Sequence, residues 1–90
     1  MQDEERFLEE HRISVLIALM DAVDHGAEVM QLAQSSTNED DFAAKLSQRF
    51  GFTAVQSRAV ADMQISRYCR LWRNRFEREV RQLREDLESS

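Results

Sequence analysis

The sequence predicts an all-α protein, built as a long antiparallel helical hairpin with a short helix at its tip. The chain of 90 residues has no proline and only two glycines, so few residues in it interrupt helices. Its hydrophobic residues make up 42% of the chain and recur three or four residues apart, without the alternation of strands. A single domain covering residues 1–90 follows, because so short a chain forms one core.

A first helix is expected from about Asp3 to about Gln34. Its acidic first turn suits the positive end of the helix dipole, and apolar residues occupy one broad face. Gly26 is the weak point, because glycine inside a helix costs about 1 kcal/mol relative to alanine. Gly26 therefore marks a bend or a close helix contact, or else the helix continues through it unbroken.

A short second helix is expected to end at Phe50, after a polar link over residues 35–38. Ser36 and Glu39 have the spacing of a capping box at its start. Gly51 supplies the left-handed residue that commonly closes a helix. The second helix then reverses the chain and forms the tip of the hairpin.

The third helix is expected to begin after Thr53, which forms a capping box with Gln56, and to extend from Ala54 to about Glu88. A break near Cys69-Arg70 stays open. An apolar seam with heptad-like spacing runs along it: Ile65, Cys69, Trp72, Phe76, Val80, Leu83 and Leu87. The first helix is expected to lie antiparallel along this seam.

The turn between the second and third helices carries a family resemblance. The order Arg49-Phe50-Gly51-Phe52-Thr53, then Gln56, then Ala59 to Asp62-Met63 resembles the coiled-coil tail of the bacterial type IIA topoisomerase A subunits, those of DNA gyrase and topoisomerase IV. Residues 11–19 and 73–83 are similar to the two arms of that tail. In this family the tail forms an exit gate where two subunits meet, away from the catalytic centre.

The resemblance implies a non-catalytic dimerisation module that forms a homodimer. Its interface would lie on the helix from Gln56 to Trp72, with these candidate contacts: Val60, Met63, Ile65, Tyr68 and Leu71. At Cys69-Arg70 the chain differs from the family, which has a helix-breaking Thr-Gly there.

Two other functions remain open. The chain could be a regulatory partner that docks on the gate of an intact gyrase A subunit. It could also bind nucleic acid, because residues 67–84 hold seven arginines against two glutamates, with Arg67, Arg70 and Arg78 as candidate contacts. Antiparallel packing would instead bring the acidic first ten residues beside these arginines and neutralise much of their charge within the protein.

We expect no catalytic residue, no cofactor and no metal. Tyr68 is the only tyrosine, but the family's tyrosine nucleophile lies in a separate domain, and Tyr68 aligns with a leucine of the gate helix. Asp21, His25 and Glu28 share one helix face at a spacing that arises often by chance. Cys69, on the apolar seam, is predicted to be a buried, inert thiol.

A cytoplasmic protein is expected, because there is one cysteine and the acidic first ten residues do not resemble a signal peptide. No membrane association is expected either, since the longest apolar run falls far short of the ~20 residues that span a bilayer. The opening Met and polar end favour a free-standing protein over a fragment.

Overall fold

A computed structural model describes residues 2–89, and the regular structure within them is helical throughout, which confirms the all-α prediction. In chain order the helices are α1 (Gln2–Asp24), α2 (Gly26–Gln34), α3 (Glu39–Phe50), α4 (Ala54–Ala61), the 3-10 helix η1 (Ile65–Tyr68) and α5 (Arg70–Ser89). None of the helices within residues 2–89 has both the length and the apolar character needed to cross a bilayer.

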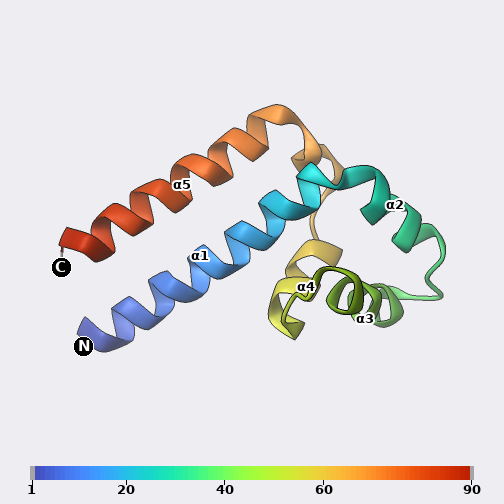
Figure 1. The fold of residues 1–90 in the computed structure, drawn as a ribbon, viewed down its shortest axis with the longest axis horizontal. Helices are drawn as coiled ribbons and strands as arrows, with labels where there is room; N and C mark the ends of the chain where they lie inside the picture. The colour runs from blue at the N-terminus through green and yellow to red at the C-terminus, as the bar shows by residue number, and fades with distance from the viewer. Residues whose placement is uncertain (1, 90) are drawn as a thin grey trace.

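Helices α1 and α5 lie side by side and antiparallel, so the start of α1 and the end of α5 are at the same end of the pair (Figure 1). We call this pair the arm. Its interior contains Ile13 and Leu16 from α1 and Phe76 and Val80 from α5, which are 5–8% exposed. The molecule measures 44 × 26 × 17 Å, and its radius of gyration of 14.1 Å exceeds the ~12 Å typical of a compact domain this long.

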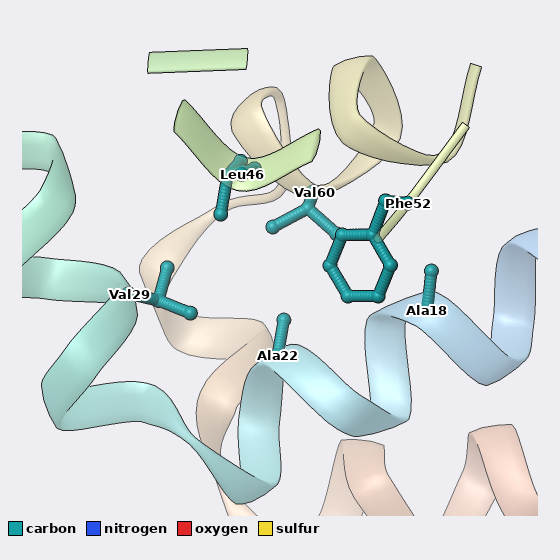
Figure 2. Close-up of a cluster of buried hydrophobic side chains, with 6 residues drawn as sticks. All are labelled: Ala18, Ala22, Val29, Leu46, Phe52 and Val60. Atoms are coloured by element: carbon teal, nitrogen blue, oxygen red, sulfur yellow. The ribbon is translucent and has the colours of Figure 1, made fainter. Parts of the chain in front are cut away.

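Helices α2, α3 and α4 gather around the end of α1 that is distant from the termini (Figure 1). We call this region the tip. Figure 2 shows its core, where side chains from α1, α2, α3, α4 and the α3–α4 turn point toward one another: Ala18, Ala22, Val29, Leu46, Phe52 and Val60. Four of these six side chains have no exposed surface, so the helices of the tip enclose this core on all sides.

The first helix bends at the position of Gly26. Helix α1 ends at Asp24, and His25 has a non-helical backbone (φ −116°, ψ 34°) before α2 begins. A Cβ at Gly26 would lie 3.5 Å from Cδ1 of Tyr68, an ordinary van der Waals distance, so the ring leaves room for a methyl group there. The glycine thus marks a bend, and the alternative of an unbroken helix to Gln34 is wrong.

The turn between α3 and α4 matches the prediction. Gly51 is left-handed (φ 73°) and its N–H donates to the carbonyl of Ser47 at 2.9 Å. Thr53 and Gln56 form the complete capping box, with each side chain accepting a hydrogen bond from the other's backbone N–H. These bonds fix the direction in which α4 leaves the turn.

The predicted capping box of Ser36 and Glu39 is wrong. The N-cap of α3 is Asn38, whose side chain accepts from the N–H of Asp41 at 2.9 Å. The hydroxyl of Ser36 instead donates to the carbonyl of Leu32 at 2.6 Å and so closes α2. Helix α3 therefore begins with a cap two residues later than predicted.

The helix expected from Ala54 to Glu88 is interrupted twice, and one break lies at Cys69-Arg70, where the sequence left a break open. The chain leaves helical geometry after Ala61 and is extended at Gln64 (ψ 143°) and Cys69 (ψ 151°), with η1 between them. Both α4 and α5 pack against α1, but one packs in the tip and the other along the arm, so a single straight helix could not reach both surfaces. We call residues 62–71 the elbow.

Candidate interaction surface

The elbow exposes two of the side chains predicted to form a dimer interface. Ile65 in η1 is 71% exposed, and Leu71 at the start of α5 is 58% exposed. Burying apolar surface gains roughly 25 cal/mol per Å², so two large aliphatic side chains left in water favour association. The elbow therefore leaves two large aliphatic side chains in water, and we call Ile65 and Leu71 together the apolar patch.

Met63 and Tyr68 hold the elbow against the rest of the protein. Both are half-buried; Met63 packs against the tip core and also against the arm interior, whereas Tyr68 packs against the tip core. Burial raises the pKa of the Tyr68 phenol above its ordinary value. Because these two residues pack against the cores, the fold fixes where the apolar patch lies on the surface.

Val60 does not lie on this surface. It is 1% exposed and occupies the tip core, because α4 turns Ser57 and Val60 toward the interior. The contact of Val60 with a second subunit stays a prediction, and Val60 is not part of the exposed surface of the elbow.

Trp72 lies near the start of α5, next to the elbow, with two arginines against its indole ring. The guanidinium carbon of Arg67 is 3.7 Å from the ring centroid, and that of Arg75 is 4.9 Å from it. Such cation–π contacts hold the side chains in place without neutralising their charge. Of the predicted nucleic-acid contacts, Arg67 is therefore engaged with Trp72, whereas Arg70 and Arg78 are exposed.

The acidic side chains of residues 3–10 form no ion pair with the arginines of α5. Within residues 3–89, Arg73 is the only one of the seven that forms ion pairs, with Asp24 and Glu77. The register of the arm explains this difference. Arg6 donates to the carbonyl of Leu87, so the start of α1 lies beyond the arginines, beside the acidic end of α5.

Cys69 is exposed, so the predicted buried thiol is wrong. The prediction assumed that a helix continues through this segment. The extended backbone at Cys69 instead moves Cys69 and Ile65 out of the apolar seam.

Asp21, His25 and Glu28, which share one helix face, form other contacts. Glu28 pairs with Arg49, and Nδ1 of His25 lies 2.9 Å from the carbonyl oxygen of Asp21. Among residues 2–89 no cluster of His, Cys, Asp and Glu side chains could hold a metal ion.

Gln56 makes a contact that the sequence did not indicate. Its side-chain amide donates to the carbonyl and to the hydroxyl of Ser14, both at 2.9 Å, while its oxygen completes the capping box with Thr53. One side chain thus caps α4 and fixes it to α1. Capping boxes are visible in sequence, but a partner 42 residues away carries no local signal.

Comparison with known proteins adds an independent observation to this geometry. The DNA gyrase A subunit of Lawsonia intracellularis is 34% identical to the chain over 74 residues, which are 82% of this chain and 9% of that protein. The chain is similar to a segment of the DNA gyrase A subunit. The gyrase A subunit of Deinococcus deserti is 35% identical over 79 residues, which are 88% of this chain and 10% of that protein. No protein-family model matches.

The similarity confirms the resemblance to gyrase A subunits that the residues around Gly51 predicted. The chain spans 9–10% of the length of the gyrase A subunits that it matches, so it corresponds to a short part of a much larger protein.

Proposed function

We propose that the chain is a non-catalytic dimerisation module in which two copies pair through the elbow. The observation that carries this proposal is the exposure of Ile65 and Leu71 on a segment held in place by Met63 and Tyr68. The similarity to gyrase A subunits supports it, because the region that the sequence resembles is the exit gate, where two subunits meet.

A two-fold contact suits a patch of this kind. In a symmetric dimer the same side chains from both copies meet, so each copy contributes Ile65 and Leu71 to one shared apolar interface. The elongated monomer has few layers of helix, and association would bury surface that its own core leaves exposed.

Charge substitutions in the patch test this proposal. We expect Leu71→Asp and Ile65→Asp each to cost at least about 2 kcal/mol of association free energy, roughly a 30-fold rise in the dimer dissociation constant. Sedimentation equilibrium would measure it. Both side chains are exposed, so the fold should persist, whereas an aspartate at Met63 would also disturb the packing of the two cores.

Val55→Asp is the matched control, because Val55 is 52% exposed on α4, outside the elbow. It should leave the dissociation constant unchanged. If Val55→Asp weakens the dimer as much as Leu71→Asp does, the interface is not at the elbow.

A second candidate function is docking of the elbow on a gyrase A subunit, in place of one copy of the homodimer. The identity of 34–35% over most of this chain favours it, since related surfaces can exchange partners. Mixing the chain with purified gyrase A subunits would test it by co-sedimentation. Binding that Leu71→Asp abolishes would support this function, and absence of binding would exclude it.

A third candidate is nucleic-acid binding through α5, favoured by the exposure of Arg70 and Arg78 without ion pairs among residues 3–89. Phosphate contacts release counterions, so binding to duplex DNA should weaken steeply between low and high salt. Replacing Arg70 and Arg78 by alanine should then weaken binding in a titration. An unchanged affinity would exclude this role for them.

A further inference from the structure

A groove of about 610 Å³ runs along one side of the arm. Val15 and Leu19 of α1 line it on one side, and Trp72 and Phe76 of α5 line it on the other. Val15, Leu19 and Trp72 are only partly buried, so apolar side chains face the groove along much of its length. This is the shape that an amphipathic helix fits.

The rim of the groove is cationic. Arg67 and Arg75 line it beside Trp72, and neither forms an ion pair among residues 3–89. An arginine stacked on an indole ring keeps its full charge and its hydrogen-bond donors at the edge of the guanidinium. The groove therefore favours an occupant that combines apolar side chains with carboxylates.

The chain itself carries such a segment. In the first turns of α1, Phe7 is 65% exposed and Leu8 is 59% exposed. They stand among five acids: Asp3, Glu4, Glu5, Glu9 and Glu10. Leu8 also lines the far end of the groove, and Glu4 lies one helical turn before Leu8 on the same face, so this segment opens onto the groove side of the arm.

We propose that the groove receives residues 3–10 of α1 from a second copy of the chain. In an antiparallel pairing of two arms, Leu8 of one copy lies opposite Val15 of its partner. The same register sets Glu4 opposite Leu19, which lines the groove together with Arg67 and Arg75. The contact is two-fold symmetric, so each copy both supplies and receives an acidic segment.

This arm contact is separate from the apolar patch of Ile65 and Leu71 and does not rest on the proposed dimer at the elbow. Salt screens its carboxylate–guanidinium pairs, so it weakens as ionic strength rises, whereas the elbow contact is apolar and resists salt. A chain with both contacts forms assemblies larger than a dimer at low salt.

The test is made in the Leu71→Asp chain, so that the elbow does not contribute. At low salt this chain should self-associate, and adding either Glu4→Arg or Arg75→Glu should raise the dissociation constant on the order of tenfold. Mixing the two charge variants should restore association, because each then offers the charge that the other requires. Sedimentation equilibrium measures the association of the Leu71→Asp chain, of each charge variant and of their mixture, and circular dichroism verifies that the variants are folded.

Arg78→Glu is the control, because Arg78 is exposed on α5 and does not line the groove. It should leave association unchanged. The proposal is overturned if the Leu71→Asp chain stays monomeric at low salt, since the occupant is then not a second copy. It is equally overturned if mixing the two charge variants does not restore association. At high salt the arm contact is screened, so comparing wild type with Leu71→Asp there measures the elbow dimer alone. Either proposal can therefore be contradicted without affecting the other.

Discussion

The tip and the arm of this molecule are built from the same kinds of residue but differ in how completely they bury them. In the tip, side chains from four helices and a turn converge, and Val29 and Leu46 have no exposed surface. In the arm, two helices share one seam, and its best-buried residues are still 5–8% exposed. A two-helix seam has open edges, which is where the groove lies.

Polar contacts differ in the same way. Within the tip, Gln56 links α4 to α1, and the hydroxyls of Ser47 and Ser57 lie 2.6 Å apart between α3 and α4. The two helices of the arm are bridged by the partly exposed ion pair Asp24–Arg73, and such pairs contribute little to stability in water. The tip is thus stabilised by its own packing, whereas the arm leaves apolar surface exposed.

Truncating one leucine in each region should give the largest contrast. Leu46→Ala leaves a cavity in a fully buried site and should lower the free energy of unfolding by about 3 kcal/mol. Leu83→Ala removes the same atoms from the partly exposed arm seam and should cost about 1 kcal/mol. Urea denaturation would measure both. Equal losses would mean that the arm is packed as completely as the tip.

Removing the Gln56 side chain should give the next largest effect. Gln56→Ala loses half of the capping box and both bonds to Ser14, so it should cost about 2 kcal/mol. Thr53→Ala, which loses the cap alone, should cost about 1 kcal/mol. Thermal unfolding would compare them. If the two variants have the same melting temperature, the hydrogen bonds from Gln56 to Ser14 do not contribute to stability.

Alanine substitutions at the two glycines should have different effects on the free energy of unfolding. Gly51→Ala forces a left-handed alanine and should cost about 1–2 kcal/mol. At Gly26 an added Cβ would meet Tyr68 at an ordinary contact distance of 3.5 Å, so Gly26→Ala should be neutral or stabilise by up to about 1 kcal/mol. Denaturation midpoints would show the difference. A large loss at Gly26 would mean that the bend itself requires glycine.

The smallest expected effect is a pH dependence at the start of α3. The backbone N–H of Thr37 donates to the carboxylate of Asp41 at 2.9 Å, and Lys45 lies close by; together they hold the pKa of Asp41 below its ordinary value of 3.8. Because the folded pKa is the lower one, this stabilisation is present above about pH 4 and is lost as the pH falls through the folded value.

Comparison with Asp41→Asn would isolate that contribution. The wild-type chain should lose more stability than Asp41→Asn between pH 5 and pH 2 in urea denaturation. Parallel curves for the two chains would show that the Asp41 carboxylate does not stabilise the fold.

The parts of the fold that local residues determine were predictable from sequence. Gly51, Thr53 and Gln56 act within a few residues of one another, so the turn between α3 and α4 has a local signal. The breaks around η1 have none, because residues 62–69 contain neither glycine nor proline. Packing of α4 in the tip and of α5 along the arm interrupts the helix there, and such long-range packing overrides local propensity.

The candidate surface was predictable to the same extent. Ile65 and Leu71 are exposed. The sequence singled them out because they are apolar residues close to the gate-like motif. Val60 follows the same apolar pattern but faces inward, and no periodicity distinguishes the two faces of a short helix such as α4. The cationic groove was missed, because it requires the register between α1 and α5.

The solution mass of the wild-type chain at high salt, followed over a dilution series, tests most directly whether the elbow joins two copies. Sedimentation equilibrium should give about twice the monomer mass of 10.6 kDa at the higher concentrations, with the dimer lost in Leu71→Asp and kept in Val55→Asp. A mass of 10.6 kDa for the wild-type chain at every concentration would contradict the proposed dimer.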